Sequence, residues 1–78
     1  MEKTKVDLMK EHLVKLEDIL NSQQSLIEKV GVLTIDMLEC PHPKLENSLN
    51  EINSKFSQNY DYIKEVMEKY EMEVNSEE

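Results

Sequence analysis

The stretch "LECPHPKLEN", residues 38–47, decides how this chain folds, because it holds the only cysteine, one of the two histidines and both prolines. A residue that precedes proline is pushed out of the α region, so neither Cys40 nor His42 is expected to be helical. Pro43 suits the first turn of a helix, where its missing N–H would have no partner in any case. The segment Cys40, Pro41, His42 and Pro43 is therefore predicted to be a turn between two helices.

Regular apolar spacing on both sides of this turn indicates two long helices. Steps of three and four residues run from Val6 to Met37, and they resume from Leu45 to Tyr70. This spacing is typical of a coiled-coil contact, and Thr4 with Asp7 can form a capping pair at its start. The predicted fold is all-α, a two-helix antiparallel hairpin of coiled-coil type with helices at about 5–39 and 43–74. Residues 1–78 form a single domain, and residues 75–78 are expected to be a frayed acidic tail.

A β-strand through residues 30–38 is the competing interpretation, because this segment is rich in β-branched residues. No second strand is present to pair with it, so the helical interpretation is preferred.

The position of the turn also predicts the register of the hairpin. Residues whose numbers sum to 82 or 83 should face each other, and the two polar members of the contact, Gln23 and Asn59, would then share one layer. The alternative, in which Tyr60 packs inward and Asn59 faces water, remains open. The predicted seam between the helices consists of Leu13, Leu16, Leu20, Gln23, Ile27, Val30, Leu49, Ile52, Phe56, Asn59, Ile63 and Tyr70.

One hairpin does not account for all the apolar residues of the first helix. Ile19, Leu26 and Leu33 form a second stripe at heptad spacing, and the segment 30–38 is apolar nearly all round. A helix that is apolar on every side is usually buried on every side, and Gly31 permits a kink or the close approach of another backbone. The predicted partner-binding residues are Ile19, Leu26, Gly31, Val32, Leu33, Ile35 and Leu38.

Composition and charge narrow the kinds of partner. The 78 residues carry a net charge of −8 and include no arginine, which argues against nucleic-acid binding and against anionic membrane surfaces. The longest apolar-rich run is far shorter than a membrane span. One cysteine forms no internal disulfide, so a cytoplasmic, reducing compartment is expected.

The residue types of the turn do not form a chemical site. Cys40 and His42 would supply two zinc ligands, whereas a structural site needs four. A Cys–His nucleophile would also need an orienting group and a pocket. No cofactor, no metal site and no catalytic residue is predicted, and the chain is not expected to be an enzyme.

The segment "SQQSLIEKVGVLTIDML", residues 22–38, resembles the stretch of Snapin-like proteins in which Ser-Gln precedes a helix with spaced leucine and glutamate. Those proteins are coiled-coil subunits of the complex for biogenesis of lysosome-related organelles. The resemblance implies a helical subunit, and no functional residue is carried over from it.

These features favour a non-enzymatic coiled-coil subunit of a larger helical assembly, with helical protein partners in a homo- or hetero-oligomer. Two alternatives stay open. One is a small acidic chaperone or inhibitor, like those of type III secretion, that binds a partner's helix through Leu26, Leu33, Ile35 and Leu38. The other is a small kinetochore ring subunit similar to those of the DASH complex.

Overall fold

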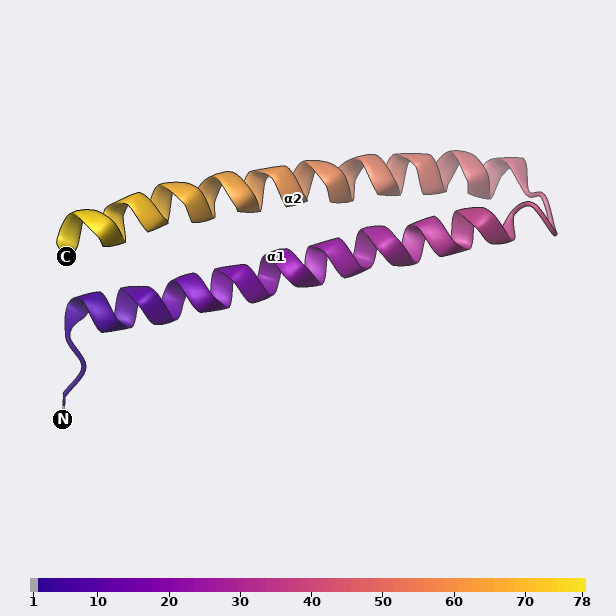
Figure 1. The fold of residues 1–78 in the computed structure, drawn as a ribbon. Helices are drawn as coiled ribbons and strands as arrows, with labels where there is room; N and C mark the ends of the chain where they lie inside the picture. Colours follow the sequence, from indigo (N-terminus) through magenta and orange to yellow (C-terminus); the bar gives the residue numbers. More distant parts are fainter. Residues whose placement is uncertain (1) are drawn as a thin grey trace.

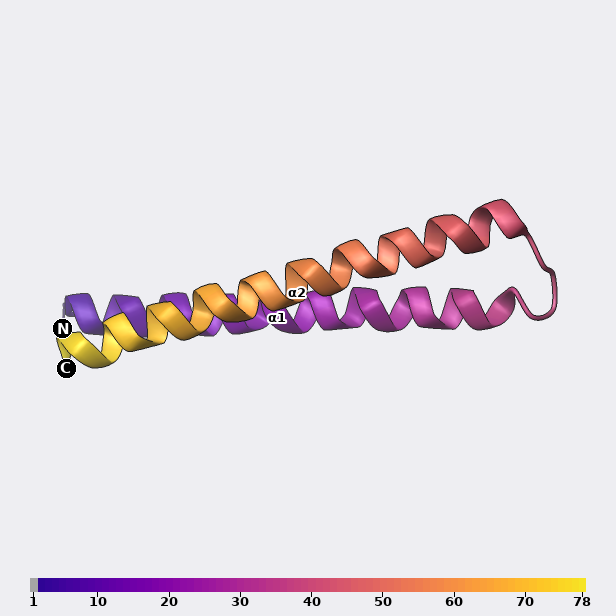
Figure 2. The ribbon, with the colours of Figure 1, turned by 90° about the horizontal axis from the view of Figure 1, so that it is seen from above.

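Two long antiparallel helices make up the computed structural model, which describes residues 2–78. Helix α1 spans Lys5–Asp36 and helix α2 spans Pro43–Glu77. Figure 1 shows them side by side, with both chain ends at one end of the molecule and the turn at the other. Seen from above, α2 crosses α1 obliquely (Figure 2). The molecule measures 58 × 22 × 12 Å, and no strand forms within residues 2–78, so the predicted all-α hairpin is confirmed.

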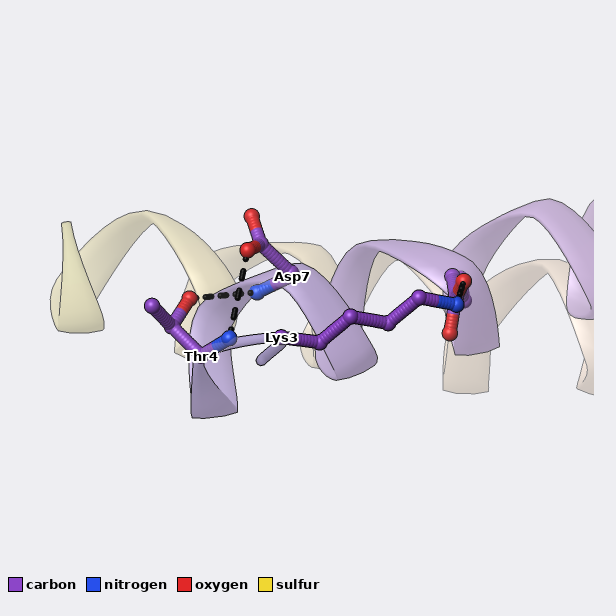
Figure 3. A network of polar contacts seen from close by, with 4 residues as sticks. Lys3, Thr4 and Asp7 are labelled. Carbon is purple, nitrogen blue, oxygen red and sulfur yellow. Dashed lines mark hydrogen bonds and ion pairs between the residues drawn. The ribbon is translucent and has the colours of Figure 1, made fainter. Parts of the chain in front are cut away.

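The start of α1 is fixed by the predicted capping pair. The Thr4 hydroxyl accepts a hydrogen bond from the Asp7 amide at 3.1 Å, and the Asp7 carboxylate accepts one from the Thr4 amide at 3.2 Å. Figure 3 shows both bonds, with Lys3 reaching along the helix to pair with Glu11. Two amides that the helix leaves without partners are satisfied in this way.

The turn begins earlier than the sequence suggests. Helix α1 ends at Asp36, three residues before the predicted Glu39, and the amides of Met37, Leu38 and Glu39 bond to carbonyls three residues back. Packed helix axes lie about 8–10 Å apart, and three residues span only about 10 Å at full extension. A link of only the three residues Cys40–His42 would therefore have to be fully extended to join the two helices. Residues 37–39 are also part of the turn and add the length that the reversal needs.

Helix α2 begins at Pro43, as predicted, and its cap is His42. The ring Nδ1 of His42 accepts a hydrogen bond from the Leu45 amide at 3.1 Å. The backbone of His42 is extended, in agreement with its position before proline. Sequence reasoning assigned His42 to the turn but missed this role.

The far end of α2 differs from the prediction, because the helix continues to Glu77 rather than ending near residue 74. Two lysines of α1 lie beside the acidic tail. Lys5 Nζ is 3.5 Å from Glu77, and Lys10 Nζ is 2.6 Å from Glu78. Glu77 and Glu78 of the tail are therefore paired with lysines of α1, and fraying of residues 75–78 stays a prediction.

The core between the helices is thin. Only Met9, Leu20, Leu49 and Val74 are buried among the described apolar residues. The register follows the prediction, since the numbers of the paired residues Lys5 and Glu77, and of His12 and Tyr70, both sum to 82.

Helix α2 faces α1 along a slightly different line from the predicted seam. Tyr60 and Met67 are half-buried and Val74 is buried, whereas Ile52 and Asn59 are exposed. Burying the row Tyr60, Met67 and Val74 removes more apolar surface from water, and it leaves no Asn59 amide in need of a partner. The alternative with Tyr60 inward is thus the observed one. Gln23 lies at the contact between the helices, but Asn59 does not. The side-chain amide nitrogen of Gln23 donates instead to the Phe56 carbonyl at 3.2 Å.

Candidate protein-docking surface

Exposed apolar side chains greatly outnumber buried ones. Among residues 2–78, thirteen large apolar residues are exposed, against four that are buried. The exposed residues are Leu8, Val14, Ile19, Leu26, Val32, Leu33, Ile35, Leu38, Leu45, Ile52, Tyr62, Val66 and Met72. Single exposed apolar residues are ordinary, but contiguous sets usually mark interaction sites.

Six of these residues lie along one side of the hairpin. Ile19 and Leu26 directly precede the seam positions Leu20 and Ile27 of α1, and Leu33 continues their row at the same seven-residue spacing. On α2, Val66 directly precedes the half-buried Met67, and Ile52 and Leu45 lie on the same row as Val66, 14 and 21 residues before it. In an antiparallel pair of right-handed helices, the rows that precede the inner positions fall on the same side. We call Ile19, Leu26, Leu33, Leu45, Ile52 and Val66 the apolar flank.

Partial exposure agrees with this placement at the edge of the contact. Leu26 and Leu33 are each 40% exposed, and Leu45, Ile52 and Val66 are 36%, 38% and 37% exposed. Each side chain thus rests partly on the hairpin and presents the rest of its surface outward. At about 1.5 Å per residue, the flank extends about 30 Å from Val66 to Leu45.

The other side of the contact is mostly polar. The corresponding rows there contain Glu17 and Gln24 of α1, and Ser57, Lys64 and Glu71 of α2. The hairpin therefore has one side suited to apolar docking and one suited to water. Sequence reasoning found the α1 half of this surface but assigned Ile52 to the seam.

The remaining predicted partner-binding residues lie at the turn end of α1 or just after it. Val32, Ile35 and Leu38 are all exposed, and Leu38 has 82% of its surface in water. A Cβ built on Gly31 would meet no atom within 4 Å. Nothing inside the hairpin therefore requires a glycine there.

Among the predicted seam residues, Leu20 and Leu49 are buried, whereas Ile52 and Asn59 are exposed. The half-buried members are Leu13, Leu16, Gln23, Ile27, Val30, Phe56, Ile63 and Tyr70. Tyr70 and His12 add a polar contact that the sequence did not indicate, with 2.9 Å between the Tyr70 hydroxyl and His12 Nδ1.

The turn carries no assembled ligand set. Cys40 is a free, exposed thiol, and His42 directs Nδ1 to the Leu45 amide. Within residues 2–78, no three or more His, Cys, Asp or Glu side chains are grouped as a metal site would need. Across that same range, neither helix has the length and apolar character needed to cross a bilayer.

Comparison with known proteins gives no match, whether to a family model, to a curated protein or to a solved structure. The resemblance of residues 22–38 to Snapin-like proteins therefore stays a prediction. The apolar flank is the feature on which a function can be argued.

Proposed function

We propose that this chain is a non-enzymatic subunit of a larger helical protein assembly and that the apolar flank is its docking surface. The observation that carries the proposal is the excess of exposed over buried apolar residues, thirteen against four. Full burial of one such side chain is worth about 1.5–3 kcal/mol. A partner that covers the flank would recover part of this for six residues at once.

The size of the core supports the same proposal. A domain of this length is near the limit at which one core stabilises a chain alone, and only four apolar residues are buried in the described part of this chain. Partners that bind the folded state add to its stability by mass action.

The experiment is affinity purification of the full chain from its native cells, followed by measurement of partner stoichiometry. The assembly proposal expects small helical proteins at fixed ratios, and the double variant Leu26→Glu/Leu33→Glu should lose them. The matched control is Val14→Glu/Met72→Glu, which places the same charges at exposed apolar positions outside the flank. Loss of partners from both variants, or from neither, would contradict the proposal.

A further inference from the structure

Lysines border the apolar flank although the protein as a whole is acidic. Lys15 lies four residues before Ile19, and Lys29 lies between Leu26 and Leu33 on the adjoining row of α1. Lys55 and Lys69 follow Ile52 and Val66 by three residues on α2. Residues three or four apart are neighbours on a helix surface, so all four lysines stand beside flank residues.

Few acids share this side of the molecule. The flank rows are positions 5, 12, 19, 26 and 33 of α1 and 45, 52, 59, 66 and 73 of α2. The rows that border them are positions 8, 15, 22, 29 and 36 of α1 and 48, 55, 62, 69 and 76 of α2. Together these positions contain five lysines, Lys5 and the four above, against the two acids Asp36 and Glu73. This gives a local charge of +3 in a chain whose total is −8. The negative charge is therefore concentrated on the other faces.

The bordering lysines are available to a partner. Among residues 2–78, Lys15 and Lys29 lie in none of the ion pairs. Lys55 and Lys69 pair with Glu51 at 3.3 Å and Glu65 at 2.9 Å on their own helix. In both ion pairs the lysine and the glutamate side chains are each more than half exposed. Surface pairs of this kind are weak enough to exchange for pairs with a partner protein.

We infer that the occupant of the apolar flank is an amphipathic helix of another protein whose apolar stripe is bordered by aspartate and glutamate. This inference rests on the proposed function and specifies the partner. Opposite charges around an apolar contact steer association and fix register, whereas like charges across it are strongly disfavoured. The length of the flank, about 30 Å, matches a helix of about 20 residues.

A second copy of this chain is the wrong partner for this surface. Two flanks placed face to face would bring lysine rows against lysine rows. Within residues 2–78, the exposed apolar residues outside the flank form no stripe of comparable length. Val14 and Met72 stand singly among acids, and the neighbouring Val32 and Ile35 are confined to the last turns of α1.

The test uses two dye-labelled synthetic peptides of 21 residues, with leucine at positions a and d of three heptads. One carries glutamate at e and g, and the other carries lysine there. Binding to the full-length protein is measured by fluorescence anisotropy at about 50 mM salt. The glutamate peptide should bind at least about tenfold more tightly, and its advantage should shrink near 1 M salt.

Two double variants with the same net charge test whether the preference for the glutamate peptide comes from the lysines beside the apolar flank. Lys15→Glu/Lys29→Glu should abolish or reverse the preference for the glutamate peptide. Lys44→Glu/Lys64→Glu changes the net charge equally on other faces and should preserve the preference. Lys44 and Lys64 are also outside the ion pairs formed among residues 2–78. Circular dichroism of both variants checks that the helices persist.

Several results would overturn the inference. These are no preference, a preference for the lysine peptide, or an equal response of the two variants. Concentration-dependent dimers that Leu26→Glu/Leu33→Glu dissolves would point to a second copy. Binding to phosphatidylserine vesicles with none to either peptide would point to a membrane surface. Fixed-ratio partners lost only from Leu26→Glu/Leu33→Glu would still support the proposed function, so the two failures are distinguishable.

Discussion

His12 and Tyr70, 58 residues apart in the sequence, share a hydrogen bond of 2.9 Å between the imidazole Nδ1 and the phenol oxygen. The contact joins the first turns of α1 to the last turns of α2 and so reports the register of the hairpin. The bond itself is exposed to water, although the Tyr70 ring is half-buried, so it contributes at the low end of the usual range of about 0.5–1.5 kcal/mol.

Tyr70→Phe should therefore lower the free energy of unfolding only slightly, by about 0.5 kcal/mol, because the ring stays half-buried. Tyr70→Ala should cost several times more through lost packing. Denaturant unfolding of both variants measures this difference. Equal losses would mean that the ring does not pack against α1.

The cap of α2 gives a second prediction. His42→Ala removes the acceptor for the Leu45 amide, and it should lower the free energy of unfolding by about 0.5–2 kcal/mol. His42→Asp keeps an acceptor and adds a favourable charge at the helix start, so its stability should equal or exceed that of the wild type. Thermal unfolding compares the three chains, with Cys40→Ser as a control that changes a free, exposed thiol. Loss of stability in His42→Asp would count against the capping role.

A substitution at Gly31 should have opposite effects on the stability of the isolated chain and on the stability of its complex. Gly31→Ala should stabilise the isolated hairpin by about 0.5–1 kcal/mol, since a Cβ there meets no neighbour and alanine is the better helix former. If a partner backbone passes close to Gly31, the same change should weaken the complex. Unfolding of the free chain, together with partner affinity, tests both parts. A destabilised free chain would contradict the open space around Gly31.

The ion pair of Glu65 and Lys69 gives a pH dependence of known sign. A hydrogen bond from Lys69 lowers the pKa of Glu65 from its usual value of 4.5. The folded-state pKa is thus below the unfolded one, so the stabilising contribution is present above pH 4.5 and is lost as the pH falls through the lowered pKa. A carbon-detected NMR titration of Glu65 should give a midpoint below 4.5, and Lys69→Gln should raise it. An unchanged midpoint in Lys69→Gln would assign the shift to another cause.

Much of this fold is predictable because its determinants are local. Pre-proline restriction at Cys40 and His42 locates the turn, and the Thr4–Asp7 pair sets the start of α1 to the residue. The end of α1 depends on how far apart the packed axes lie, and at the end of α2 the acids Glu77 and Glu78 pair with lysines about seventy residues away in the sequence. Neither feature can be read from a short stretch of sequence.

The apolar flank was predictable in part for the same reason. Heptad spacing identifies Ile19, Leu26 and Leu33 within one helix. The α2 half depends on the rotation of α2 about its axis, which is decided by burial of Tyr60 and Met67 in place of Asn59 and Val66. Because the two rows of α2 are adjacent and both largely apolar, periodicity alone does not choose between them.

The most direct test of the docking role is circular dichroism with analytical ultracentrifugation of the full chain, alone and with its purified partners. Leu26→Glu/Leu33→Glu should keep most of the helicity of the free chain and lose the complex, because both side chains are already 40% exposed. Leu20→Glu/Leu49→Glu should unfold the free chain, because those leucines are buried and a charge there costs several kcal/mol. If Leu26→Glu/Leu33→Glu unfolds the free chain as completely as Leu20→Glu/Leu49→Glu does, the flank serves the hairpin's own core and the docking role is wrong.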